Sequence, residues 1–138
     1  MGRILAIDFG RKRTGLAVTD ILRITANPLL TIETKDLMDW LSDYFAHEPV
    51  DEVVIGHPTQ MNGMESESMN YIRPFMGNFK KQFPNKPIIM YDERFTSVLA
   101  HRAMLAGGMK RKDRQDKAAV DKIAACIILE GYLDSLLK

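Results

Sequence analysis

The 138 residues, 46% hydrophobic and 27% charged, have the size and composition of one globular domain spanning residues 1–138. No apolar run approaches the roughly 20 residues that a membrane-spanning helix needs, and the start lacks the apolar core of a signal peptide. We therefore expect a cytoplasmic protein with no membrane partner. The single cysteine, Cys126, excludes an internal disulfide and a thiolate metal cage.

The net charge of +1 conceals an uneven distribution of charged residues along the chain. Residues 1–23 and 94–117 carry net charges of +3 and +5, whereas residues 24–93 carry −6. This segregation is expected when one face of a protein binds a polyanion such as nucleic acid. The alternative is a solvated surface on which the charges cluster by chance.

Three strands are predicted before the first helix. Residues 4–7 form a continuous apolar run that leads into Asp8, and residues 16–18 return beside it after a basic turn. Residues 24–32 favour a third strand, which Pro28 restricts to a sheet edge or a bulge.

The middle of the chain alternates between helical and strand periodicity. A helix starts at Leu37, with Thr34 or Asp36 available as its cap and Pro49 as its terminator. Residues 53–56 then form a short buried strand. The next helix covers about residues 65–82, where Pro74 is expected to introduce a kink or to mark the true start, and residues 87–91 form the last strand.

Two helices are predicted after the last strand. The first begins near Thr96 or Ser97 and ends at the glycines of residues 107–108. A basic loop over residues 109–117 leads to the final helix. The packed face of that helix is predicted to carry Val120, Ile123, Ala124, Ile127 and Ile128.

This order of elements predicts an α/β fold with a mixed five-stranded sheet, an antiparallel meander plus parallel strands, and helices on its faces. In such sheets, sites form beyond the carboxyl ends of the parallel strands. Asp8 and Glu93 both follow strands of this kind.

Three acidic residues, Asp8, Glu93 and Asp121, lie in or directly after apolar segments. Each has a simpler explanation alone, since Asp8 could open a turn and the other two could serve helix N-termini. Three carboxylates brought together, however, would need a cation. Without a Cys or His ligand set, oxygen ligation favours Mg²⁺ or Mn²⁺, and a pair of such ions can cleave a phosphodiester.

Basic residues accompany each of these acids in the sequence and could hold a phosphate backbone. His57 is a further candidate, either as a substrate contact or as an ordinary surface histidine. The predicted nucleic-acid-binding residues are Arg11, Lys12, Arg13, Arg94, Lys110, Arg111, Lys112 and Arg114.

Four segments in order, over residues 8–20, 56–63, 92–97 and 120–133, resemble the YqgF (RuvX-like) family. That family is described as Holliday-junction-resolvase-like and as a pre-16S rRNA nuclease. The resemblance implies a ribonuclease H-like fold and Mg²⁺- or Mn²⁺-dependent hydrolysis of structured nucleic acid in the cytoplasm. It places the acidic triad on Asp8, Glu93 and Asp121, and a substrate loop that includes His57 and Asn62.

The chain departs from the family pattern at two places. Arg11 stands where the family commonly has Thr, which adds charge beside the site. Residues 57–60 replace a Leu-Pro-Leu-Asn-like run, which alters the substrate loop. Neither change touches the acids, so both bear on substrate preference.

The leading prediction is a metal-dependent nuclease, with two metal ions once substrate is bound, that processes the 5′ end of pre-16S rRNA in ribosome biogenesis. One alternative is a resolvase of four-way DNA junctions, and another is a non-catalytic RNA-binding module. ATP handling is a weaker alternative, because 138 residues cannot supply the second domain and second phosphate loop that actin-like ATPases need. Ribosome-associated partners and a monomer or weak dimer are also expected, whereas endonucleolytic or exonucleolytic action stays open.

Overall fold

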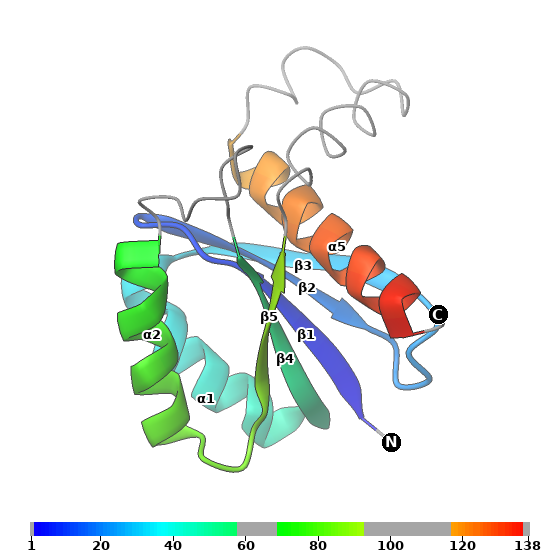
Figure 1. Cartoon of the computed structure of the whole chain (residues 1–138), viewed down its shortest axis with the longest axis horizontal. Coiled ribbons are helices and arrows are strands. Elements are labelled where there is room, and N and C mark those ends of the chain that lie inside the picture. The colour runs from blue at the N-terminus through cyan, green and yellow to red at the C-terminus, as the bar shows by residue number, and fades with distance from the viewer. Residues whose placement is uncertain (1, 58–68, 93–116, 137–138) are drawn as a thin grey trace.

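The computed structural model describes residues 2–57, 69–92 and 117–136, and for His57, Asp92 and residues 117–122 it describes the backbone alone. Figure 1 shows the helices and strands in the order of the chain. They are β1 (Arg3–Asp8), β2 (Arg13–Thr19), β3 (Ala26–Glu33), the 3₁₀ turn η1 (Thr34–Asp36), α1 (Leu37–His47), β4 (Val50–His57), α2 (Met69–Gln82), β5 (Ile88–Asp92) and α5 (Lys117–Leu136).

The strands form one mixed five-stranded sheet in the order β3-β2-β1-β4-β5. Strand β2 is antiparallel to both β1 and β3, whereas β1, β4 and β5 run parallel. This topology confirms the predicted meander followed by parallel strands. It also places the apolar β1 in the middle of the sheet, where both of its faces can be covered.

Strand β3 is an edge strand of the sheet, as its proline predicts. The β2–β3 register shifts where Leu16 pairs with Leu30 and Ala17 pairs with Pro28, so one residue of β3 is left out of the pairing. A proline has no N–H for a ladder hydrogen bond, and an edge or a bulge tolerates that loss. Strand β3 therefore lies at the sheet edge and also contains a bulge, the two alternatives predicted from Pro28.

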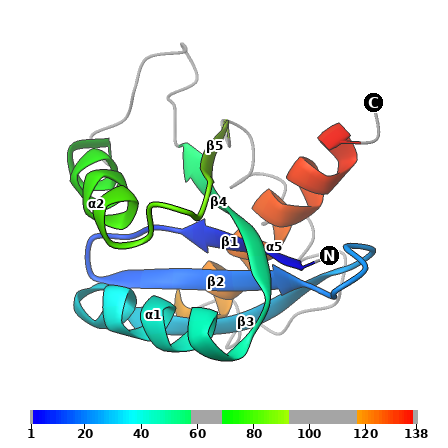
Figure 2. The same ribbon diagram turned by 90° about the horizontal axis from the view of Figure 1, so that it is seen from below.

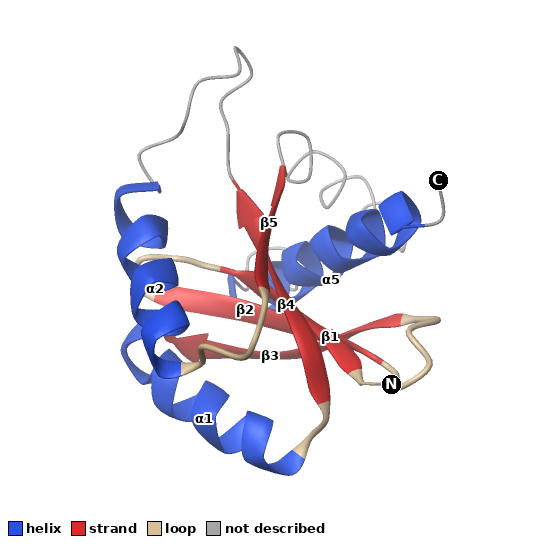
Figure 3. Cartoon of the chain, turned by 60° about the horizontal axis from the view of Figure 1, so that its bottom comes forward, coloured by secondary structure: helices blue, strands red, loops and turns tan. Residues whose placement is uncertain are grey.

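The sheet separates two hydrophobic cores, with α1 and α2 on one face and α5 on the other (Figures 2 and 3). Successive side chains of a strand point to opposite faces. Accordingly, Leu5 and Ile7 of β1 belong to the core under α1 and α2, and Ile4 and Ala6 belong to the core under α5. All four side chains are fully buried.

The packed face of α5 differs from the predicted one. Ile128 is fully buried as predicted, but Ala124 and Ile127 are only partly buried, and the fully buried neighbours are Ala125 and Leu129. The helix is apolar around most of its circumference, so periodicity could not select the contact face. A small side chain at Ala125 lets the helix backbone approach the sheet closely.

Two predictions about the other helices are corrected or resolved. The cap of α1 is Asp36 by position, but its side chain makes no capping hydrogen bond. Pro74 lies inside α2, so it does not mark the start of that helix. The predicted start of α2 near residue 65 and the whole helix from Thr96 lie outside the described residues.

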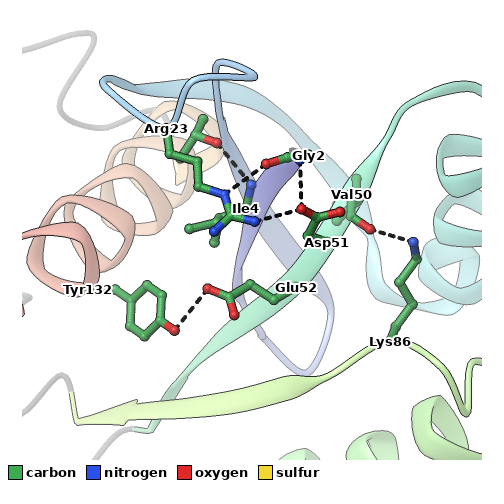
Figure 4. A network of polar contacts seen from close by, with 9 residues as sticks. Gly2, Ile4, Arg23, Val50, Asp51, Glu52, Lys86 and Tyr132 are labelled. Carbon is green, nitrogen blue, oxygen red and sulfur yellow. Dashed lines mark hydrogen bonds and ion pairs between the residues drawn. The ribbon is translucent and has the colours of Figure 1, made fainter. Parts of the chain in front are cut away.

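The edge of the sheet at the amino end of β1 is held by a polar network (Figure 4). The Asp51 carboxylate accepts hydrogen bonds from the Gly2 N–H and the Arg23 guanidinium, each at 2.7 Å. Arg23 also donates to the Gly2 carbonyl at 2.9 Å. Its backbone has a φ of 59°, unusual for a residue with a side chain. These contacts tie the β2–β3 hairpin to the start of β1 and to β4.

Candidate active site

Asp8 lies at the carboxyl end of β1, next to the ends of the two other parallel strands. Ile7 pairs with Ile55 of β4, and the last pair between β4 and β5 joins His57 to Asp92. Asp8 itself pairs with a β2 residue and is half-buried. The three strand ends therefore meet at one edge of the sheet, where sites in open α/β sheets form.

The second predicted acid, Glu93, directly follows the last residue of β5 and lies outside the described residues. The third, Asp121, belongs to α5, for which the backbone places it one turn before Ala125. Ala125 packs against the middle of the sheet beside Ala6. Tyr132, further along α5, reaches Glu52 near the amino end of β1.

From these contacts, the start of α5 must lie toward the carboxyl ends of the parallel strands. Figure 1 shows the same direction, since β4 and β5 end on the side of the sheet where α5 begins. The backbone thus directs Asp8, the end of β5 and the first turns of α5 toward one edge. Convergence of the three carboxylates stays a prediction, because two of the side chains are outside the description.

The donor atoms at this edge of the sheet determine which metal ion could bind there. Carboxylate oxygens are hard ligands that suit Mg²⁺ or Mn²⁺, and Asp8 supplies one at a half-buried position. Within residues 2–57, 69–92 and 117–136, no group of three or more His, Cys, Asp or Glu side chains could hold a metal ion. A site would therefore need carboxylates from outside the described side chains, such as those of Glu93 and Asp121.

The turn between β1 and β2 presents the predicted basic residues Arg11, Lys12 and Arg13, all three of which are exposed. The turn is tightly built, since a Cβ added at Gly10 would collide with the carbonyl oxygen of Arg13. Thr34 fastens it from η1. The Thr34 Oγ1 donates to the Gly10 carbonyl at 2.6 Å, and the Thr34 N–H donates to the Lys12 carbonyl at 2.9 Å.

Thr34 therefore has a different role from the helix cap that the sequence suggested. Its hydroxyl bonds the turn rather than the start of α1, and it also lies 2.9 Å from the hydroxyl of Thr14. These bonds fix a basic turn that begins one residue beyond Asp8. The other predicted nucleic-acid-binding residues and Asn62 lie outside the described residues, and His57 is the last residue of β4 rather than part of a loop.

A pocket of about 320 Å³ adjoins this turn, and we call it the Tyr71 pocket. Phe9 and Arg11 line it from the turn, and Asn70, Tyr71, Phe75 and Asn78 line it from α2. Tyr71 is not among the residues predicted from the sequence. Its signal would have been an aromatic residue on the polar side of an otherwise amphipathic helix, since 42% of Tyr71 is exposed.

A larger hollow of about 740 Å³ lies between the β2–β3 hairpin and the end of α5. It is lined by residues such as Ile24, Thr25 and Leu133, at the opposite edge of the sheet from Asp8. Its size alone does not make it an active site, because none of the predicted acidic or basic site residues is among the described residues that line it.

The family of the chain follows from comparison with known proteins. A family model described as "RuvX: Holliday junction resolvase" matches residues 2–135. The chain belongs to the RuvX family. The resemblance noted from the four sequence segments is thereby confirmed.

Relatives of this RuvX-family chain are similar over nearly their whole length. Proteins of Phocaeicola vulgatus and Bacteroides thetaiotaomicron are 57% and 56% identical to it over 135 residues. The alignments cover 98% of this chain and 97% and 98% of those proteins, respectively. A Porphyromonas gingivalis protein is 55% identical over the same length. All three carry the name "Putative pre-16S rRNA nuclease".

Among solved structures, the chain is similar to T. thermophilus RuvC in complex with a Holliday junction substrate. The TM-score is 0.59, and the match covers 98% of each chain at 11% sequence identity. At this identity the likeness concerns the fold alone, and it confirms the ribonuclease H-like architecture expected from the sequence. None of the helices in the described part of the chain is long and apolar enough to cross a membrane.

Proposed function

We propose that this protein is a nuclease that hydrolyses phosphodiester bonds of structured RNA and processes the 5′ end of pre-16S rRNA. The observation that carries the proposal is the meeting of β1, β4 and β5 at one edge, with Asp8 at the end of β1 and an exposed basic turn directly beyond it. An acidic centre beside a basic surface suits a polyanionic substrate. The names of the relatives agree with this activity.

We propose a role for each of the predicted site residues. We assign Asp8, Glu93 and Asp121 as the ligands of Mg²⁺ or Mn²⁺, which when bound would activate water and stabilise the leaving oxygen. Arg11, Lys12 and Arg13 hold phosphates from the turn, and the late basic residues from 94 to 114 extend that contact. Phosphate contacts of this kind position the backbone without reading its sequence.

Resolution of four-way DNA junctions is the second candidate function, favoured by the description of the family model. The two candidates differ in substrate rather than in chemistry. Pre-rRNA, a four-way DNA junction and plain duplexes should therefore be offered in parallel with Mg²⁺ or Mn²⁺, and the ends of the cuts mapped. If only the four-way junction were cut, the function would be junction resolution and not rRNA processing.

The acid set is tested by Asp8→Asn. Even changes in outer-shell partners of a metal commonly cost 10–100-fold in activity, so loss of a ligand is expected to lower RNA cleavage by more than about 100-fold. RNA binding should persist, because the basic turn is unchanged. Asp43→Asn is the matched control, since it removes an exposed carboxylate on α1 and should leave cleavage unaltered. Undiminished turnover of Asp8→Asn would refute the assignment.

A further inference from the structure

The Tyr71 pocket lies beside the candidate active site and has a composition that phosphate binding does not require. We infer that it holds one unstacked nucleobase of a single-stranded segment, next to the bond that is cut. Because this assignment depends on the proposed nuclease function, it deepens that function. It narrows the substrate to nucleic acid with an unpaired base beside the cleavage position.

The wall of the pocket is an exposed aromatic ring paired with a guanidinium. Tyr71 is 42% exposed, and the Cζ atom of Arg11 lies 5.3 Å from the centre of its ring. Aromatic rings and arginine planes are the two surfaces on which proteins stack unpaired bases. A base entering here would meet a π-face and a positive charge together.

The floor of the pocket is apolar and closely packed. The rings of Phe9 and Phe75 stack with their centres 4.7 Å apart, and Phe75 is only 7% exposed. This stack holds Phe9 in place, and Phe9 directly follows Asp8. The pocket therefore begins one residue from the proposed metal ligand, and a base bound there would have its phosphate near the acidic edge.

The rim of the pocket carries groups that can hydrogen-bond the edge of a base. Asn70 and Asn78 are both exposed and flank Tyr71 along α2. Each side-chain amide supplies donors and an acceptor. Pro74, which also lines the pocket, has no N–H to donate to the Asn70 carbonyl in the helix ladder. A mixed donor and acceptor rim suits a base better than it suits an apolar protein side chain.

The position of Arg11 is fixed before any ligand arrives. Thr34 bonds the carbonyls of Gly10 and Lys12, the residues on either side of Arg11. Figure 1 shows the β1–β2 turn beside the first turn of α2, in agreement with the contact between Arg11 and Tyr71. Two segments some sixty residues apart in the sequence thus form one preorganised surface, which lowers the entropy lost on binding.

A base within a duplex cannot occupy this pocket, because it is stacked and paired. Duplexes would use only the phosphate contacts of the basic turn. The pocket therefore predicts that Tyr71 matters for single strands and not for duplexes. A merely structural Arg11–Tyr71 contact predicts no such difference.

The test measures binding without metal, so that no cleavage occurs. Fluorescein-labelled single-stranded RNA of 12 nucleotides and the corresponding blunt RNA duplex are titrated by anisotropy in EDTA. Tyr71→Ala is expected to weaken binding of the single strand by roughly 5- to 150-fold, the cost of losing one stacking platform, and to change duplex binding less than about 2-fold. Tyr71→Phe should bind the single strand as the wild type does.

Two further variants separate stacking from charge. Arg11→Lys keeps the charge but loses the planar guanidinium, so it should weaken single-strand binding more than duplex binding. Lys81→Ala, at the far end of α2, removes an exposed charge outside the pocket and should preserve the ratio of the two affinities. Melting curves of all variants verify folding. Equal losses for single strand and duplex with Tyr71→Ala, or no loss for either, would overturn the pocket assignment.

Different outcomes would refute the pocket assignment and the nuclease function. If the wild type cleaves RNA while Tyr71→Ala binds single strands normally, the pocket assignment is wrong and the nuclease function stands. If single strands bind in a Tyr71-dependent manner but no substrate is cut with Mg²⁺ or Mn²⁺, the pocket stands and the nuclease function fails.

Discussion

Cys126 shows how position on α5 determines the chemistry of one residue. Its Sγ lies 3.5 Å from the Ala26 carbonyl oxygen and 3.9 Å from Oε1 of Glu130. Burial, and then the nearby Glu130 carboxylate, raises the pKa of the thiol to about 11. Because the thiolate is the nucleophile, this cysteine should be nearly inert at neutral pH.

We expect iodoacetamide at pH 8 to alkylate Cys126 about 100-fold more slowly than a free thiol, because its pKa is raised from an ordinary value of 9.0 to about 11. Mass spectrometry of the intact protein measures the rate. Glu130→Gln should accelerate the reaction, because it removes the negative charge beside the thiol. Alkylation as fast as that of glutathione would contradict the burial of this side chain.

The strands of the sheet were predictable from the sequence because each carries its own local signal. Continuous apolar runs identified β1 and β4 as buried strands, and Pro28 identified β3 as an edge strand. The contact face of α5 was not predictable, since a helix that is apolar nearly all round offers several faces to the sheet. In the structure, the face that carries Ala125, Ile128 and Leu129 packs against the sheet.

The candidate site was predictable to a similar, partial extent. Asp8 and the basic turn are contiguous in the sequence, and the sheet topology places them at the carboxyl edge as expected. The Tyr71 pocket was missed because Phe9 meets Phe75, and Arg11 meets Tyr71, only when α2 packs beside the β1–β2 turn. Such a juxtaposition leaves no signal in local periodicity.

At the scale of one helix, Gly77 of α2 is a position where alanine should stabilise the protein. A Cβ added there would meet no heavy atom within 4 Å, and glycine costs about 1 kcal/mol relative to alanine inside a helix. Gly77→Ala should therefore raise the free energy of unfolding by about 0.5–1 kcal/mol in urea titrations. Gly10→Ala is the contrasting variant and should be destabilising, because its Cβ would collide with Arg13. A destabilised Gly77→Ala would show that its site is not open.

Across the whole molecule, the two edges of the sheet carry different kinds of polar residue. At the amino end of β1, Arg23 bonds to Asp51 and to the backbone, and Glu52 accepts a hydrogen bond from the Tyr132 hydroxyl (Figure 4). At the carboxyl end, basic residues of the turn are exposed beside Asp8. The contacts at the first edge join the hairpin, β4 and α5, and the proposed substrate site lies at the second.

Tyr132 connects α5 to β4 at the edge of the sheet near the amino end of β1. Its ionisation should therefore affect the stability of the whole fold. Its hydroxyl donates to Oε1 of Glu52 at 2.9 Å. Burial, and then this bond to a carboxylate, raises the pKa of Tyr132 to about 12, from an ordinary value of 10.0. The unfolded chain therefore loses this proton first. The stabilisation is complete below pH 10 and is lost as the pH rises from 10 to 12.

Tyr132→Phe is expected to lower the free energy of unfolding by about 1 kcal/mol at pH 8, the usual value of a partly exposed hydrogen bond. Above pH 10 it should also make the fall in stability less steep, since the raised tyrosine pKa is gone. Urea titrations from pH 8 to 12 in a Cys126→Ala background measure both effects without the thiol, whose own raised pKa would add to the slope. Glu52→Gln keeps an oxygen acceptor but removes the charge. Its free energy of unfolding should therefore lie between those of Tyr132→Phe and its parent. If Tyr132→Phe lost stability above pH 10 as steeply as its parent, the raised pKa of Tyr132 could not be the source of that loss.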